Sequence, residues 1–226
     1  MTGGDGVTVV IPVRDGEAFL AEAVRSALDQ TRPPAEVIVV DDGSSDGSAG
    51  LARALGATVI DQPPLGPGAA RNRGAAHATT PLLAFLDGDD RMTPDRLVVQ
   101  ARALVDGPDL DGALGLMRRF APGRPPTGDP EPCLLPSALL VRRQVFLDSG
   151  GFDPDLPAGE FVDWLTRCRE AGRHFTVLDA VVVERRAHDG NLTRDRERVR
   201  AGYLAVARSA IERRRREAAA PDDHPG

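Results

Sequence analysis

Two hydrophobic runs of this chain each end in a cluster of aspartates with glycine. The runs are residues 36–40 and 82–86, and the carboxylates that follow belong to Asp41, Asp42, Asp87, Asp89 and Asp90. Runs of this length that are rich in Val, Ile and Leu indicate strands of a parallel sheet buried on both faces. The carboxyl ends of such strands share one edge, which is where open α/β sheets bind ligands. Four or five carboxylates there predict a site for a divalent cation and a phosphate-bearing ligand.

Strand and helix patterns alternate along the first half of the chain. Strands are expected over residues 8–13, 36–40, 57–60 and 82–86, and helices between them over residues 19–28, 44–55 and 66–78. This order predicts a single α/β domain of Rossmann-like type, with a mainly parallel, twisted sheet that is flanked by helices.

The pattern becomes less regular after Asp90. Helices are expected over residues 94–105, 161–171 and 196–214, and strands over 111–120, 137–142 and, as a pair around Asp179, 175–185. The proline and glycine content of residues 122–136 predicts a long loop. The last helix would place one apolar face, made of Val199, Tyr203, Val206, Ala210 and Ile211, either on the core or against a second copy of the chain in a homodimer.

Composition excludes several classes of protein. The chain has no lysine, which excludes P-loop nucleotidases, pyridoxal-phosphate enzymes, Schiff-base aldolases and receiver domains, since their chemistry needs an amine. The formal charge of −6 argues against a nucleic-acid partner. Neither Cys133 nor Cys168 has the spacing of a zinc or redox pair. Without a signal peptide or an integral membrane segment in the sequence, we expect a soluble, cytoplasmic protein.

A glycine-containing loop lies between the two acidic clusters in the sequence. Residues 66–74 offer backbone amides and two arginines, whose guanidinium groups match the geometry of phosphates. The order Asp87-Gly88-Asp89 gives alternate carboxylates around a glycine that lets a ligand approach closely. An isolated Asp-x-Asp is more often an ordinary turn, so the prediction depends on the neighbouring strand and loop.

Five segments, in the order in which they occur, resemble family 2 glycosyltransferases of the GT-A fold. They lie within residues 7–188 and are residues 10–13, 39–47, 68–74, 86–94 and 150–153. The resemblance implies that a sugar moves from a nucleotide diphosphate, most commonly UDP, to an acceptor, usually with inversion and with Mn²⁺ or Mg²⁺ as cofactor. The acceptor would be a soluble small molecule, peptide or saccharide.

The resemblance also divides the chain into parts. Residues 7–90 would form the nucleotide-sugar-binding half of the catalytic domain and residues 91–192 the acceptor-side half. We expect a flexible N-terminus over residues 1–6, a C-terminal helix over 193–216 and a flexible tail over 217–226.

Individual residues receive roles from the same resemblance. The nucleotide-sugar would be bound by Pro12, Val13, Arg14, Asp41, Asp42, Gly68, Arg71, Asp87 and Gly88. Arg71 would lie near the base or the phosphates. Asp89 would ligate the metal, and His188, in the late segment 185–191, would complete the metal shell. The cation would offset the charge that grows on the leaving diphosphate.

One position departs from the pattern of the family. Residues 160–167 match a segment that normally reads Glu-Asp-x-Asp, and Phe161 replaces the aspartate that serves inverting members as general base. Three alternatives follow: Glu160 or Asp163 is the base, the acceptor is one such as a thiol that needs no strong base, or the protein binds nucleotide-sugar without turnover. Asp163 and Arg167 lie one helical turn apart, which also predicts a simple ion pair between them.

Overall fold

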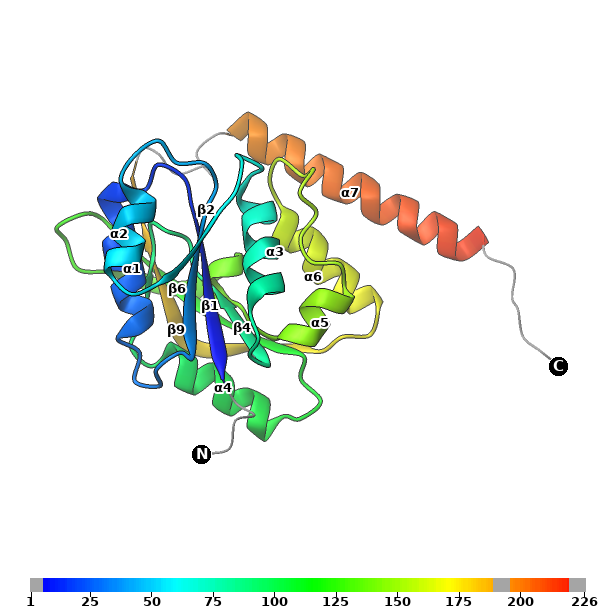
Figure 1. Ribbon diagram of the computed structural model, residues 1–226. Coiled ribbons are helices and arrows are strands. Elements are labelled where there is room, and N and C mark those ends of the chain that lie inside the picture. Colours follow the sequence, from blue (N-terminus) through cyan, green and yellow to red (C-terminus); the bar gives the residue numbers. More distant parts are fainter. Residues whose placement is uncertain (1–5, 189–195, 220–226) are drawn as a thin grey trace.

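A nine-stranded sheet runs through the part of the chain that the structure describes, and helices cover both faces of it (Figure 1). The structure is a computed structural model and describes residues 6–188 and 196–219. The strand order is β3 (Thr58–Asp61), β2 (Glu36–Asp41), β1 (Val7–Val13), β4 (Leu82–Phe85), β8 (Leu140–Arg142), β6 (Gly112–Phe120), β9 (Phe175–Arg186) and β5 (Arg91–Met92), and β7 (Thr127–Pro132) pairs with β6 outside this path.

The first half of the sheet is parallel, as the alternating pattern predicts. Its strands are β1 (Val7–Val13), β2 (Glu36–Asp41), β3 (Thr58–Asp61) and β4 (Leu82–Phe85). Successive side chains point to opposite faces, so Val9 and Ile11 of β1 enter one hydrophobic cluster and Val10 enters the other. The carboxyl ends of these strands therefore form the common edge at which the acidic residues lie.

Helices fill both faces of the sheet. One face is covered by α1 (Glu17–Leu28), α2 (Ser48–Ala54) and α4 (Arg96–Asp106), the other by α3 (Pro67–His77), α5 (Arg143–Asp148) and α6 (Glu160–Glu170) (Figure 1). The short α5 was not expected from the sequence. Its buried Phe146 packs against Trp164 of α6 with ring centroids 5.6 Å apart, so α5 supports the helix that carries the unusual Phe161.

The second half of the sheet is mixed. Its strands are β5 (Arg91–Met92), β6 (Gly112–Phe120), β7 (Thr127–Pro132), β8 (Leu140–Arg142) and β9 (Phe175–Arg186). β8 joins the two halves because it pairs antiparallel with both β4 and β6, while β6 and β9 run parallel. This arrangement brings the end of β9 to the edge where β1, β2 and β4 end.

Three expectations for this half are wrong in detail. Residues 122–136 are not all loop, because β7 pairs with β6; a strand with a single partner tolerates prolines, which cannot donate to a second neighbour. Residues 175–185 form one strand, not two, and the register shift near Asp179 marks an irregularity within it. Residues 137–142 begin as a 3₁₀ turn (Pro136–Ala138) before β8.

The last helix, α7 (Arg196–Ala219), packs on α6 and extends beyond the rest of the domain (Figure 1). α7 also lies close to the residues just before α6, since a Cβ at Gly202 would lie 2.2 Å from the carbonyl oxygen of Ala158. Val206 is buried, but Tyr203 and Ile211 are 51% and 52% exposed, so the predicted apolar face is only partly covered. None of the helices within residues 6–188 and 196–219 has the length and apolar character needed to cross a membrane.

Both cysteines are buried and form no disulfide. Burial raises the pKa of the Cys133 thiol to about 12, and burial also raises the pKa of Cys168. Because the thiolate is the reactive form, we expect the folded protein to leave both thiols unmodified by an aromatic disulfide reagent at about pH 8, and the unfolded protein to titrate both. Rapid modification of either thiol in folded protein would contradict this packing.

Candidate active site at the carboxyl edge of the sheet

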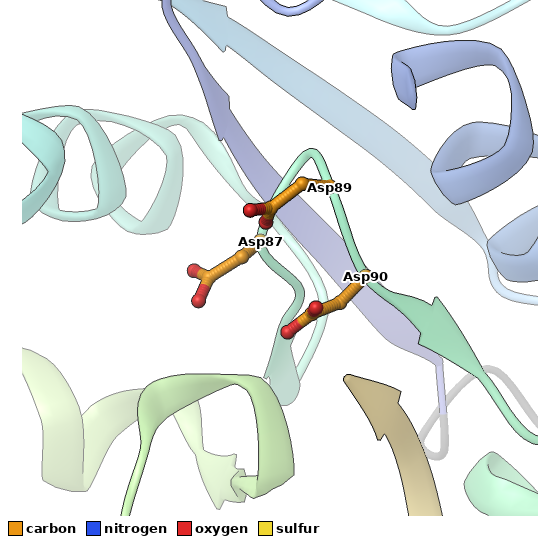
Figure 2. Close-up of side chains that lie close together, drawn as sticks. All are labelled: Asp87, Asp89 and Asp90. Atoms are coloured by element: carbon orange, nitrogen blue, oxygen red, sulfur yellow. The ribbon is translucent and has the colours of Figure 1, made fainter. Parts of the chain in front are cut away.

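Three carboxylates gather in the turn that follows β4. The ligand atoms of Asp87, Asp89 and Asp90 all lie within 4.8 Å of one another, and the three side chains extend to the same side of the turn (Figure 2). Gly88 lets this turn pack on the end of β1, since a Cβ there would lie 3.2 Å from the carbonyl oxygen of Pro12. The acidic turn and the end of β1 thus form one continuous edge, as predicted.

The ionised carboxylates of this turn repel one another. Burial, followed by the charges of Asp87 and Asp89, raises the pKa of Asp90 well above its ordinary value, although Asp90 Oδ1 accepts the backbone N–H of Arg186 at 2.9 Å. Burial also raises the pKa of Asp87, but the Arg71 guanidinium outweighs it and the net pKa is below the ordinary value. Hard oxygen donors held this close, where the charges of two of them raise the pKa of the third, fit a divalent cation.

His188 reaches the acidic turn from the residues just after β9. Its Nε2 lies 2.8 Å from Asp89 Oδ2, and its ring packs on Phe19 of α1 with centroids 4.7 Å apart. Arg186 supports the same turn because its Nε donates to the carbonyl oxygen of Asp89 at 2.8 Å. The structure therefore brings together the two predicted metal ligands, Asp89 and His188. Residues 189–191 of the late segment lie outside the described residues.

The aspartates after β2 do not join the three carboxylates. Asp42 accepts hydrogen bonds from the backbone N–H groups of Leu65 and Gly66, both at 2.8 Å, and Asp41 accepts that of Ser44 at 2.7 Å. Both aspartates are buried. Within the described residues, the group of carboxylates that could hold a cation therefore has three members, Asp87, Asp89 and Asp90, while Asp41 and Asp42 lie elsewhere along the same edge. Asp41 and Asp42 instead shape the loops that lead into α2 and α3.

The loop after β1 lies beside the loop after β2. Val13, the last residue of β1, accepts the backbone N–H of Asp42 at 2.8 Å, and the N–H of Asp15 donates to Ser44 Oγ at 3.0 Å. Arg14 projects from this loop with 56% of its side chain exposed. The residues expected to border the nucleoside therefore lie together along the ends of β1 and β2.

Arg71 of α3 connects the acidic turn to the start of α6. Its Nη2 lies 2.5 Å from Asp87 Oδ1 and its Nη1 lies 2.9 Å from Glu160 Oε1. Gly68, one turn earlier, is the neighbour of the same glutamate, since a Cβ there would lie 3.8 Å from Glu160 Cγ. This double ion pair, in which one buried guanidinium joins the turn after β4 to the first residue of α6, was not expected from the sequence.

The next residues of α6 face away from this edge. Phe161 is 2% exposed and packs against Phe152 and Trp164, with ring centroids 6.4 Å and 6.0 Å away. Asp163 is also buried. Arg167 Nε lies 2.8 Å from Asp163 Oδ2, which confirms the predicted ion pair. Arg213 Nη1 lies 3.1 Å from the other carboxylate oxygen, Asp163 Oδ1. Glu160 is the residue of this segment that lies beside Asp87.

Removal of the Asp163 carboxylate is expected to lower stability more than chemistry. In Asp163→Asn the guanidinium groups of Arg167 and Arg213 lose their shared anion, and the free energy of unfolding should fall by about 3 kcal/mol. Urea denaturation measures this loss. Full stability combined with lost turnover would instead identify Asp163 as a catalytic residue.

The model of glycosyl transferase family 2 matches residues 8–130, which include β1, the α3 helix with Arg71 and the acidic turn. The chain belongs to glycosyl transferase family 2. The segment with Glu160 and Phe161 lies outside the matched region.

Relatives support this membership. The pre-mycofactocin glycosyltransferase of Mycobacterium tuberculosis (strain ATCC 25618 / H37Rv) is 36% identical over 214 residues, which cover 81% of this chain and 42% of the relative. The succinoglycan biosynthesis protein ExoU of Rhizobium meliloti (strain 1021) is 35% identical over 133 residues, covering 51% of this chain and 39% of the relative. This family 2 chain thus matches about two fifths of the length of these relatives.

Solved structures confirm the GT-A fold. Mannosyltransferase PcManGT from Pyrobaculum calidifontis, in complex with GDP-Man and Mn²⁺, superposes with a TM-score of 0.73 at 20% identity, covering 91% of this chain and 64% of that one. S. aureus TarS 1–349, in complex with UDP-GlcNAc, gives a TM-score of 0.70 at 22% identity, covering 84% and 61%.

Proposed function

We propose that this protein transfers a sugar from a UDP-sugar to an acceptor, with a divalent metal and with inversion at the anomeric carbon. The observation that carries the proposal is the turn after β4, where Asp87, Asp89 and Asp90 lie within 4.8 Å of one another in a chain of glycosyl transferase family 2. Structural neighbours in complex with UDP-GlcNAc or with GDP-Man and Mn²⁺ support a nucleotide-sugar as the donor class.

On the donor side, the residues present fit Mn²⁺ or Mg²⁺. Asp89 and His188 are the proposed ligands, with Asp87 and Asp90 as the other acidic groups of the turn. The cation, when bound, supplies positive charge that offsets the charge on the leaving diphosphate. The rest of the donor would lie along the strand ends, against Pro12, Val13, Arg14, Asp41, Asp42, Gly68 and Gly88, whose loops are held by the hydrogen bonds described above.

On the acceptor side, we assign the proton-accepting role to Glu160. Its carboxylate lies beside Asp87 through their shared Arg71, whereas both oxygens of Asp163 are engaged by guanidinium groups in the interior. A base at this position takes the proton of the acceptor hydroxyl as it attacks, which typically contributes about two to four orders of magnitude in rate. Residues 7–90 would then hold the donor and residues 91–192 would shape the acceptor side.

The test is release of UDP from a panel of UDP-sugars, with water, alcohols, thiols and saccharides as acceptors, in the presence and absence of Mn²⁺. We expect one UDP-sugar to release UDP only with metal. The surface variant Arg102→Met, which loses an exposed ion pair with Asp106, serves as control and should match the wild type. Failure of folded protein to release UDP from any donor would overturn the proposal.

A protein that binds a nucleotide-sugar without transferring the sugar is the second candidate. The observation that favours it is Phe161, which fills the expected position of the base with a buried ring. Tight, metal-dependent binding of one UDP-sugar without turnover across the whole acceptor panel would establish this alternative.

A further inference from the structure

We propose that Arg71 is a positioning residue, which holds the acceptor-side carboxylate of Glu160 at a fixed place relative to the metal-binding turn. The proposal rests on the proposed function and deepens it. It gives Arg71 a role that acts through Glu160, in place of direct contact with the base or phosphates of the nucleotide.

Both terminal nitrogens of the Arg71 guanidinium already form ion pairs within the protein. Nη2 contacts Asp87 at 2.5 Å and Nη1 contacts Glu160 at 2.9 Å, and only 5% of the arginine side chain is exposed. Its Cζ also lies 5.9 Å from the centroid of the Phe152 ring. A guanidinium is stable in such a buried place when carboxylates neutralise it, so the two ion pairs keep Arg71 where it is.

The two partners come from distant parts of the chain. Asp87 lies 16 residues after Arg71, at the end of β4, and Glu160 lies 89 residues after it, at the start of α6. The two Nη atoms belong to one planar, rigid fork, unlike the single ammonium of a lysine. A fork that binds one carboxylate on each Nη therefore fixes the two carboxylates relative to each other.

Glu160 is the part of this arrangement that needs such support. It is the first residue of α6 and follows Gly159, whose φ of 83° lies in the left-handed region. The backbone of α6 is fixed by the buried Phe161 and Asp163, but a glutamate side chain keeps several rotatable bonds. The ion pair to Arg71 restricts these bonds and directs the carboxylate to the edge of the sheet.

Arg71→Met tests the role because methionine keeps most of the length and removes the fork. We expect kcat for transfer to fall about a hundredfold, as for a reacting group displaced by about 1 Å, with KM for the UDP-sugar nearly unchanged. Arg71→Lys should recover part of the rate, since its charge remains but reaches one carboxylate at a time. Arg102→Met is the matched control on the surface of α4.

A double-mutant cycle separates action through Glu160 from a general effect on the fold. Glu160→Gln removes the proposed base but leaves the Arg71 to Asp87 pair in place, so the variant should fold. If Arg71 acts through Glu160, Arg71→Met combined with Glu160→Gln is no slower than Glu160→Gln alone. Additive losses in kcat would overturn the positioning role.

Binding measurements distinguish failure of the positioning role of Arg71 from failure of the proposed function. Calorimetry with UDP and Mn²⁺ should give the same affinity for wild type and Arg71→Met. A tenfold or greater loss of UDP affinity in an otherwise active protein would show that Arg71 contacts the nucleotide, which overturns the positioning role alone. If the wild type neither binds UDP nor releases it from any UDP-sugar, the proposed function fails and the positioning role of Arg71 in transfer fails with it.

Discussion

Asp89→Asn is expected to abolish metal-dependent binding of the UDP-sugar and to lower the rate of transfer at least about a hundredfold. Asp89 lies at the centre of the proposed metal site, within 4.8 Å of the ligand atoms of Asp87 and Asp90 and 2.8 Å from His188 Nε2. Titration of UDP-sugar with and without Mn²⁺, followed by single-turnover kinetics, measures both effects.

Stability gives an internal control for this variant. Asp89 adds a repelling charge to the turn, so its loss should leave the free energy of unfolding unchanged or slightly higher in the absence of metal. Asp106→Asn, a change of the same kind at an exposed carboxylate, should have no effect on binding. Undiminished Mn²⁺-dependent binding by Asp89→Asn would show that the metal lies elsewhere.

Phe161→Asp is expected to destabilise the protein by at least about 4 kcal/mol and to leave the rate of transfer no higher. The substitution restores the residue that the family pattern predicts, but the Phe161 ring is 2% exposed and packs among Phe152 and Trp164. A carboxylate there would be buried in an apolar cluster, away from Glu160 and the acidic turn. Such a loss is a large part of the stability of an ordinary domain.

Thermal or urea unfolding of Phe161→Asp, beside Phe161→Leu, measures the effect. The leucine variant keeps the side chain apolar and should lose much less stability, with its transfer rate unchanged. A stable Phe161→Asp protein with a faster rate would show that position 161 faces the acceptor, and that the base of this chain was lost by substitution.

Hydrophobic patterning was sufficient to predict the parallel half of the sheet. The runs before Asp41 and Asp87 are β2 and β4, and the edge at which they end holds the acidic turn. The second half was harder to predict because β5 has two residues and α5 has six, which is too short for a periodic signal. The prolines of β7 are typical of loops, so the pattern of residues 127–132 does not predict a strand.

The contacts of the candidate site could not be predicted from the sequence, for a different reason. The sequence pattern of an aspartate after a strand is the same whether its oxygens bind a cation or backbone amides. Only the fold shows that Asp42 accepts the N–H groups of Leu65 and Gly66. The ion pair of Arg71 with Glu160 spans 89 residues and leaves no local trace in the sequence. Such contacts are tertiary, so a single sequence without structure does not predict them.

The orientation of Phe161 did leave a signal in the sequence. Phe161, Trp164, Leu165 and Cys168 follow the spacing i, i+3, i+4, i+7, which is that of one helix face, and all four are buried. Glu160 falls outside this face. Helical periodicity thus indicates that position 161 belongs to the core and that Glu160 does not. The family motif, which places a general base at position 161, does not indicate this difference.

The central claim is that the acidic turn binds a metal and a uridine nucleotide together, and calorimetric titration of UDP into the folded protein tests it most directly. We predict binding with Mn²⁺ present, little or none when the metal is chelated, and none in Asp89→Asn under either condition. Equal UDP affinity with and without metal, or no binding of UDP by folded protein that contains Mn²⁺, would contradict the account.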